Sequence, residues 1–401
     1  MLLWSGWMGE LSQGTSPAIF PGPIYFPELM PCRCGKRRFG EVRGVAEMRT
    51  SFNSRLDDAF RGSLLADAAA MPVHWYYDTA CLDRDYPDFR LFLAPRGCHP
   101  NSILWRSKYV PSNDDADILH DQAAYWGKRD VHYHQFLRAG ENTLNFKLAA
   151  ELYLQVRTIG RYDPDLWLET YVDLMRTPGW HRDTYVEECH REFFKRRAAG
   201  LELRECGIED IHIGGLAMVP ALVAGLAASG EADEERLVSS VRIHVGLTHV
   251  SAETLDAAEA LTRILIALAW GMEWAEAVDT FASSWLKRWG SLDGLGDLDD
   301  RVVVGRHLTS ACYLPDSFSA SLWLCSKYWN GFEEGVVANS ICGGDNCHRG
   351  AVVGSVLGAL NGVPERLSGR LVGLEPILGL VGEADAPASE SLDPGPHPPR
   401  V

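Results

Sequence analysis

The sequence has no apolar run long enough to cross a membrane, and its first residues do not form a secretory signal. A spanning helix needs roughly 18 or more mostly apolar residues, and no segment of the 401-residue chain reaches that length. The initial stretch MLLWSGWMGELSQG lacks a basic region and a sustained apolar core. We therefore expect a cytoplasmic protein without a membrane partner.

Basic residues are in deficit. The chain has 38 Lys and Arg residues against 54 Asp and Glu residues, and its formal net charge is −16. An acidic surface repels phosphate backbones, so nucleic acid is not an expected partner. A small anionic ligand remains compatible with this charge, because the N-terminus of a helix attracts anions locally.

Clustered cysteine pairs are also lacking. The 10 cysteines are scattered along the chain, which indicates a reduced intracellular protein rather than a disulfide framework. Cys32 and Cys34 form a single C-x-C pair, but no second pair lies near them, so a structural zinc site is not expected there.

Strand-like alternation is scarce and no βαβ pattern appears, so we predict an all-α fold. The segments with helical spacing of apolar residues are 54–71, 143–156, 163–176, 214–229, 251–269 and 350–361. Two of them, 214–229 and 350–361, are apolar or small on every side, which predicts buried helices.

Composition divides the chain into three parts. Residues 1–47 are rich in proline and glycine and lack helical periodicity, and we interpret them as a disordered leader or an over-long gene model. Residues 48–381 are predicted to form one compact multi-helix domain. Residues 382–401 are acidic and proline-rich, which predicts a disordered tail.

The densest group of chemically active side chains lies in residues 340–350, SICGGDNCHRG. Its two glycines and four possible ligand residues are Gly343, Gly344, Asp345, Asn346, Cys347 and His348. They converge at the start of a small-residue helix, where the helix dipole favours anions and the side chains suit a metal. The simpler interpretation is a tight turn capped by Asp345.

Three other polar segments lie beside predicted helices. Residues 140–143 (GENT) precede a strong helix and resemble an ordinary N-cap. Residues 74–77 (HWYY) place a histidine before three aromatics, which either stack on a nucleobase or cover the core. Residues 181–190 carry many polar groups, among them Arg182, which is suited to a phosphate; the alternative is a solvated helix face.

Taken in order, these segments resemble the ADP-ribosylglycohydrolase family, which includes the dinitrogenase-reductase-activating glycohydrolases. Residues 62–74 are similar to the family's G-x-L-L-G-D-A-L-G-x-P-V-E helix, and residues 140–143 to its T-D-D-T motif. Residues 214–225 resemble its glycine-rich central helix, residues 247–261 its L-T-H helix, and residues 343–348 its G-G-D-T-D-T motif. The resemblance extends over roughly residues 54–380 and implies the family's all-α fold.

The resemblance also implies a two-magnesium centre that holds the ribose hydroxyls and prepares water to attack the anomeric carbon, releasing ADP-ribose from a protein side chain. The metal ligands implied by position are Glu141, Asn142, Thr143, Asp345, Cys347 and His348. The implied catalytic residues are Glu141, Asp345 and His74, which stands where the family has the P-V-E glutamate. The implied substrate contacts are Trp75, Tyr76, Gly343, Gly344, Asn346 and Arg182.

The metal motifs depart from the family pattern. Asp345 is the only unaltered carboxylate; Glu141 and Asn142 replace two aspartates, and Cys347 and His348 replace an aspartate and a threonine. Magnesium prefers hard oxygen ligands, whereas Cys and His favour a softer ion such as Zn, Mn or Fe.

The expected function is a metal-dependent hydrolase that releases ADP-ribose from an N- or O-glycosidic linkage on a protein or a small adduct. Its partner would be ADP-ribose or an ADP-ribosylated protein. The main alternative is a non-catalytic descendant that binds ADP-ribose or a nucleotide, or that is purely structural. A third is an enzyme with Cys347 as nucleophile beside His348, although adjacent side chains on a helix diverge.

Overall fold

The computed structural model describes residues 38–287 and 295–373. The chain divides into two units, Met1–Gly44 and Val45–Val401. The predicted leader up to residue 37, the Cys32–Cys34 pair and the predicted tail lie outside the described residues.

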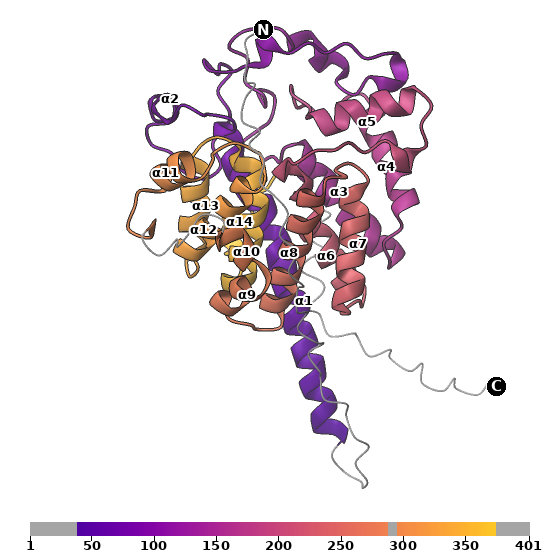
Figure 1. Cartoon of the computed structure of the whole chain (residues 1–401), viewed down its shortest axis with the longest axis vertical. Coiled ribbons are helices and arrows are strands. Elements are labelled where there is room, and N and C mark those ends of the chain that lie inside the picture. Colours follow the sequence, from indigo (N-terminus) through magenta and orange to yellow (C-terminus); the bar gives the residue numbers. More distant parts are fainter. Residues whose placement is uncertain (1–37, 288–294, 374–401) are drawn as a thin grey trace, which may run out of the picture. The chain divides into compact units, whose positions relative to one another are not determined.

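The described residues form α-helices, short 3-10 turns and one π-helical segment, Val303–His307, with isolated β-bridges but no extended strand (Figure 1). The all-α prediction is therefore confirmed. The helices are α1 (Arg38–Ala70), α2 (Thr79–Asp85), α3 (Leu144–Ile159), α4 (Pro164–Arg176), α5 (Glu188–Ala198), α6 (Val219–Ala228), α7 (Glu234–Gly246), α8 (Ala252–Ala269), α9 (Trp274–Phe281), α10 (Ser283–Lys287), α11 (Asp300–Val302), α12 (Asp316–Lys327), α13 (Phe332–Ile341), α14 (Asn346–Asn361) and α15 (Glu365–Ser368).

Local signals account for several helix ends. Asp163 accepts hydrogen bonds from the first free N–H groups of α4, and Pro164 occupies the first turn, where a missing N–H costs nothing. Gly160 ends α3 in the left-handed region, at φ 74°. These signals are readable in the sequence, which explains why the ends of α3 and α4 lie close to their predicted positions.

Three predicted helices differ in extent from the observed ones. α1 begins at Arg38 instead of near residue 54. The segment 214–229 is broken into a 3-10 turn, Ile213–Leu216, and α6. The polar run 181–190 is helical only from Glu188, the first residue of α5.

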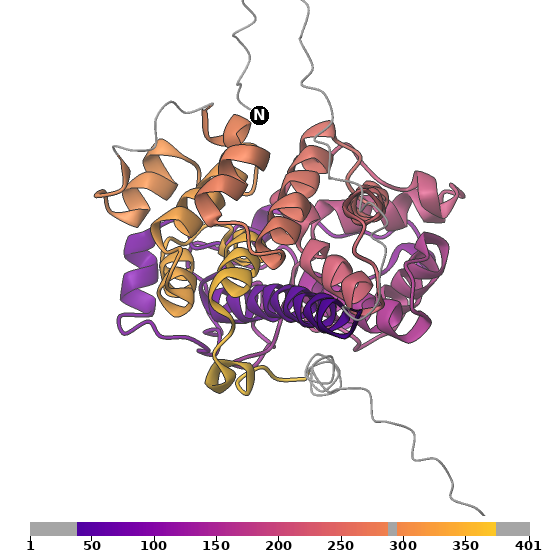
Figure 2. The same ribbon diagram turned by 90° about the horizontal axis from the view of Figure 1, so that it is seen from below.

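The part of α1 from Val45 onward lies between two groups of helices (Figure 2), with α3–α7 on one side and α12–α14 on the other. α1 and α14 cross with almost no side chain between them. A Cβ added at Gly354 of α14 would lie 2.2 Å from the carbonyl oxygen of Gly62 in α1, and one at Gly358 would lie 2.3 Å from the carbonyl oxygen of Asp58. On another face of α1, Phe60 stacks on Tyr153 of α3 with ring centroids 4.6 Å apart.

This crossing generates a stability prediction. In Gly354→Ala the new methyl group meets the backbone of α1, and we expect the free energy of unfolding to fall by about 1–3 kcal/mol, as for other overpacked sites. Gly246→Ala is the matched control, because its Cβ meets only Leu255 Cδ2 at 3.9 Å; removing a helical glycine there stabilises by roughly 0.5–1 kcal/mol. Equal denaturation midpoints for the two variants would contradict the close crossing.

A second prediction concerns pH. Asp57 of α1 is 4% exposed, and burial raises its pKa to about 7 against the opposing charges of Arg157 and Arg61. Between about pH 4 and 7 the folded state keeps a proton that the unfolded chain releases. The free energy of unfolding therefore falls as pH rises through this window, by about 4 kcal/mol in total.

Asp57→Asn removes the carboxyl group that keeps this proton in the folded state. We expect the variant to lose that part of the pH dependence and to gain stability relative to the parent at pH 8, measured by urea unfolding at several pH values. Asp256→Asn, at a carboxyl group that is 64% exposed, is the control and should keep the parent profile.

Candidate active site

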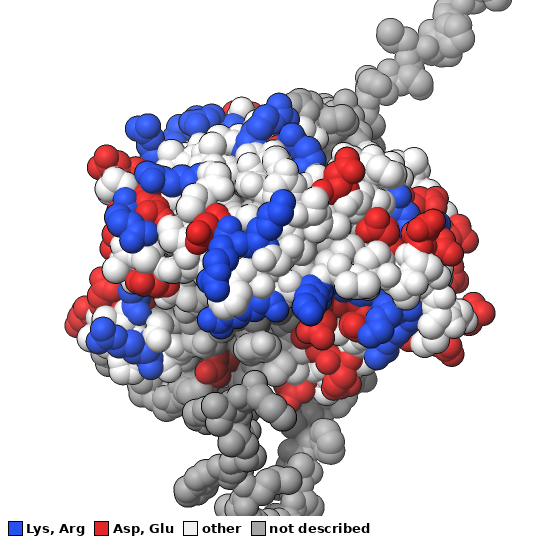
Figure 3. Space-filling model, turned by 90° about the horizontal axis from the view of Figure 1, so that it is seen from above, with Lys and Arg blue, Asp and Glu red and all other residues white. Residues whose placement is uncertain are grey.

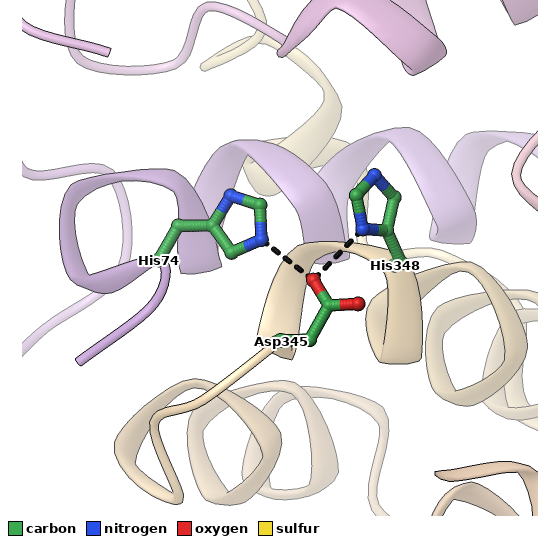
Figure 4. A group of neighbouring side chains, drawn as sticks. All are labelled: His74, Asp345 and His348. Atoms are coloured by element: carbon green, nitrogen blue, oxygen red, sulfur yellow. Dashed lines mark hydrogen bonds and ion pairs between the residues drawn. The ribbon is translucent and has the colours of Figure 1, made fainter. Parts of the chain in front are cut away.

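Two histidines from distant segments meet on one buried carboxylate (Figure 4). His74 follows the turn after α1, while Asp345 and His348 lie at the start of α14. Asp345 Oδ1 accepts hydrogen bonds from His74 Nε2 at 2.7 Å and from His348 Nδ1 at 2.8 Å. All three residues are at most 3% exposed. Asp345 and His348 are three positions apart, so one helical turn brings them together.

Glycines hold the two segments in contact. Gly343 and Gly344 adopt φ 65° and 63°, in the region that favours glycine. A Cβ at either position would lie 2.2 Å or less from a carbonyl oxygen, that of Tyr76 or of Ser310. The Gly344 N–H donates to the Tyr76 carbonyl and the Gly344 carbonyl accepts from the Trp75 N–H, both at 2.8 Å. These backbone hydrogen bonds place the neighbouring His74 beside Asp345.

The hydrogen bonds continue from His74 into the interior. His74 Nδ1 lies 2.8 Å from His134 Nε2, and His134 Nδ1 lies 2.7 Å from Asp183 Oδ1. Two ionised carboxylates and two imidazoles joined by three hydrogen bonds need three ring protons, so the imidazole pair carries one positive charge. Burial lowers the pKa of His74 to about 3. Burial disfavours ionised Asp183, but the hydrogen bond and charge of His134 keep its pKa low.

His348 continues the series on its other side. Its Nε2 lies 3.2 Å from Glu187 Oε1, and Glu187 Oε2 accepts a hydrogen bond from Asn145 at 2.6 Å. Burial alone would lower the pKa of His348, but the charges of Asp345 and Glu187 raise it to about 9. Burial opposes ionisation of Glu187, yet the facing histidines lower its pKa to about 2. We call Asp183, His134, His74, Asp345, His348 and Glu187 the buried His–carboxylate chain.

Two buried carboxylate oxygens of the buried His–carboxylate chain meet no hydrogen-bond partner, namely Asp345 Oδ2 and Glu187 Oε1. His212 Nε2 is 3.8 Å from the first and 3.5 Å from the second. Unpaired buried oxygens are costly and call for an unseen partner such as a water molecule or an ion. Glu187 Oε1 already faces the imidazoles of His348 and His212, so Asp345 Oδ2 is the oxygen with the fewer close polar neighbours.

A cavity of about 210 Å³ adjoins these groups. It is lined by Trp75, Tyr77, Ile103, Leu104, Ser107, Tyr133, Tyr185, Glu187, Glu188, Asp210, His212, Cys312 and Tyr313. Burial and the charge of Glu187 raise the pKa of Asp210, against the charge of His212. The cavity thus joins aromatic rings to acidic groups beside the buried His–carboxylate chain.

His74, Asp345 and His348 form a set of donor groups that fits one divalent ion. Their donor atoms all lie within 4.8 Å of one another, and two imidazoles with one carboxylate suit Zn, Fe or Mn. The second ring nitrogen of each histidine already faces a further group, His134 or Glu187, as second contacts of metal-bound histidines do. The unpaired Asp345 Oδ2 leaves a further oxygen available.

The implied T-D-D positions bond to other groups than Asp345, although Thr143 lines a small cavity together with His74 and His348. Thr143 Oγ1 donates to Asp67 Oδ1 at 2.7 Å, and Asn142 Nδ2 donates to Asp67 Oδ2 at 2.8 Å. The polar contacts of Glu141 include ion pairs with Arg182 at 2.6 Å and Lys147 at 2.9 Å. The structure thus brings Asp345, His348 and His74 into contact. Thr143 reaches the same small cavity as the two histidines, while Glu141 and Asn142 pair with other groups.

Residues beside Asp345 support the backbone. Asn346 Nδ2 donates to the carbonyls of Ser340 at 2.8 Å and Val73 at 3.2 Å. Cys347 is fully buried in a small apolar cluster with Ala70 and neighbours, and burial raises the pKa of its thiol well above the usual range. A protonated thiol is a poor nucleophile, which argues against Cys347 chemistry.

The two aromatics expected to contact substrate have different surroundings. Trp75 lines the cavity and stacks on His74 with centroids 3.8 Å apart. Tyr76 is fully buried, and its hydroxyl donates to Asp85 at 3.2 Å. The adjacent Tyr77 lines the cavity and is 49% exposed.

Several groups of the site carried little signal in the sequence. Asp183 and Glu187 lie in the polar run 181–190, whose composition is equally typical of a solvated helix face. His134 lies in an irregular segment without periodicity, and His212 precedes the glycines of the central motif. Their roles depend on long-range contacts, which no local pattern encodes.

Comparison with known proteins identifies the fold and the family. The ADP-ribosylglycohydrolase sequence family matches residues 48–390. One similar solved structure is described as an ADP-ribosylglycohydrolase-related protein complex; it is 20% identical, the match covers 83% of this chain and 98% of that chain, and the TM-score is 0.56. That identity supports the fold alone. No curated protein matches, and no helix among the described residues is long and apolar enough to cross a membrane.

The buried charges generate a prediction. Asp183 is fully buried, and Asp183→Asn would remove the negative charge that faces the His134–His74 imidazole pair. Breaking a buried ion pair in this way costs about 3–5 kcal/mol of unfolding free energy, measurable by chemical denaturation. Asp173→Asn, at an exposed position of α4, should change stability by less than about 0.5 kcal/mol. A similarly small effect for Asp183→Asn would contradict a positive charge on the imidazole pair.

Proposed function

Because the chain belongs to the ADP-ribosylglycohydrolase family, whose members are hydrolases that act on ADP-ribosylated substrates, we propose that it cleaves the glycosidic bond joining ADP-ribose to a protein or a small adduct. The observation that carries this proposal is the meeting of two imidazoles on one carboxylate oxygen beside a cavity. The family is generally dependent on divalent metals, and this set of side chains supplies candidate ligands.

The proposed metal site consists of His74, Asp345 and His348, and its ion is softer than magnesium. A nitrogen-rich donor set favours Zn, Mn or Fe, whereas magnesium prefers oxygen ligands in octahedral geometry. When bound, the ion supplies positive charge that orients the substrate oxygens and favours ionisation of water.

Two carboxyl groups of the cavity are suited to move protons. Glu187 is ionised, and its Oε1 makes no hydrogen bond although His348 Nε2 lies 3.2 Å away, so this oxygen accepts the proton of the attacking water. The hydroxyl of that water joins the anomeric carbon, the bond to the leaving atom breaks, and the leaving atom takes a proton from Asp210 at the cavity wall. Solvent then restores both groups to their starting protonation states.

The other positions implied by the family resemblance act on these groups indirectly. Asn142 and Thr143 bind Asp67 of α1 and so fix the start of α3, from which Asn145 reaches Glu187. Arg182 pairs with Glu141 and fixes the segment that carries Asp183. Trp75 covers His74 and forms part of the cavity wall.

The first test measures ADP-ribose release from arginine- and serine-linked substrates with Mg, Mn, Zn or EDTA. We expect release that depends on Mn or Zn and falls by at least about 100-fold in Asp345→Asn, because the variant loses the charge that binds the ion. Asp173→Asn is the control and should retain full activity. Absence of release with every metal, together with ADP-ribose binding, would establish the non-catalytic alternative.

The second test measures metal affinity directly by equilibrium dialysis with Zn and Mn. We expect His348→Gln to weaken metal binding by about 10- to 100-fold or more. Removing a residue that only hydrogen-bonds to a metal-binding side chain already has an effect of that size. His120→Gln, at a partly exposed histidine outside the cluster, should leave affinity unchanged. Unaltered affinity in His348→Gln would place the ion elsewhere.

A further inference from the structure

A group of basic side chains lies on the surface beside the cavity. Its members are exposed, namely Arg106, Lys108, Lys128 and Arg129, and we call them the basic rim. Within the described part of the chain, none of the four side chains forms an ion pair or a hydrogen bond. Asp130 is the single acidic residue within two positions of them in the sequence, so the basic rim keeps an excess of positive charge.

The basic rim is assembled from two segments that contact each other. The Gly127 N–H donates to the Leu104 carbonyl at 3.3 Å, which places the two segments side by side. The guanidinium carbons of Arg106 and Arg129 lie 4.9 and 3.8 Å from the centroid of the Trp105 ring. Two like charges are therefore held at one indole ring, which cation–π attraction favours and their mutual repulsion opposes. An anion bound between them relieves that repulsion.

The basic rim adjoins the cavity of the candidate active site. Leu104 and Ser107, which flank Trp105 and Arg106 in the sequence, both line that cavity. The segment between α2 and α3 forms the top of the molecule in Figure 1, and Figure 3 is the view from that side. Lys and Arg cross the middle of this face, while Asp and Glu gather mainly toward its edges (Figure 3). A positive surface thus lies beside the cavity of a chain whose net charge is −16.

These features favour an acidic polypeptide over other anions. Two guanidinium groups already lie over the ring of Trp105, whereas a single-stranded nucleic acid needs open aromatic faces for its bases. A diphosphate is one compact anion, but the four cations are distributed over two segments. Ile103 and Val110 are 50% and 84% exposed, and apolar side chains next to arginine are typical of surfaces that bind proteins.

We propose that the basic rim binds an acidic segment of the protein whose ADP-ribose group enters the cavity. Glu and Asp side chains of that segment pair with the four cations, and complementary charge of this kind steers encounter and fixes orientation. The inference rests on the proposed function for the nature of the bound protein. Binding at the basic rim itself requires no hydrolysis, so it can be measured separately.

The first test is the binding of unmodified peptides to the full chain, followed by fluorescence anisotropy. One fluorescein-labelled peptide alternates Glu with Gly, and the comparison peptide has Gln in place of Glu. We expect the acidic peptide to bind at least about 4-fold more tightly at low salt, since four exposed charge pairs contribute about 1.4- to 5-fold each. This preference should shrink as salt screens the charges.

Two double variants locate the binding. Arg106→Gln with Arg129→Gln should weaken binding of the acidic peptide by about 2- to 25-fold and leave the Gln peptide unaffected. The matched control is Arg236→Gln with Arg366→Gln, which changes the net charge equally but removes exposed arginines that pair with glutamates on α7 and α15. It should bind the acidic peptide like the parent.

Kinetics separate the bound segment from the nucleotide. In the Arg106→Gln and Arg129→Gln double variant, we expect KM for an ADP-ribosylated acidic peptide to rise by the same factor while kcat stays unchanged. KM for free ADP-ribosyl-arginine should also stay unchanged, because that adduct has no acidic segment. An equal rise in KM for the free adduct would overturn the proposal, since it would assign the two arginines to the diphosphate.

Two binding results would also overturn the proposal. Equal affinity for the two peptides would show that carboxylates are not recognised, and tighter binding of a single-stranded oligonucleotide would assign the surface to nucleic acid. Charge-dependent peptide binding without hydrolysis would support the basic rim and reject only the proposed function. Hydrolysis by a chain without that peptide preference would do the reverse.

Discussion

The compensation of one buried charge organises this site. Asp345 is fully enclosed, and an isolated carboxylate in such surroundings would be too costly to remain ionised. Its hydrogen bonds to His74 and His348 offset that cost and hold its pKa well below the usual range although burial opposes this. Each histidine then needs its own partner, so the compensation spreads outward to His134 and Glu187.

The close crossing of α1 and α14 makes this arrangement geometrically possible. Small residues let the two helices approach to backbone contact, and the ends of these helices supply His74 and Asp345 respectively. A displacement at the crossing is therefore transmitted to both sides of the site. Packing and chemistry are coupled here, because the groups that must lie within hydrogen-bond distance are attached to two helices whose backbones are in contact.

Family membership supports the fold and the general class of reaction, whereas the local chemistry of the site supports the proposals about its ligands. The family match covers most of the chain and accounts for the fold and the general class of reaction. The donor atoms around Asp345 include more nitrogen than a magnesium centre prefers, and the adjoining cavity combines acidic groups with aromatic rings. The proposed metal and the proposed docking of an acidic segment both follow from local features, because each concerns the chemistry of specific side chains and not the fold that carries them.

The sequence by itself determined the helices and the order of the motifs. Apolar spacing and caps act within a few residues, so α3, α4 and α8 were predictable from local patterns, and Asp345 and His348 were found because they lie one turn apart in a dense motif. Only the tertiary structure decided which distant groups complete the site. His74 and Asp345 are 271 positions apart, and His134 and Asp183 are 49 apart. Pairings of that kind depend on how the helices pack, and the chain's local periodicity does not specify that packing.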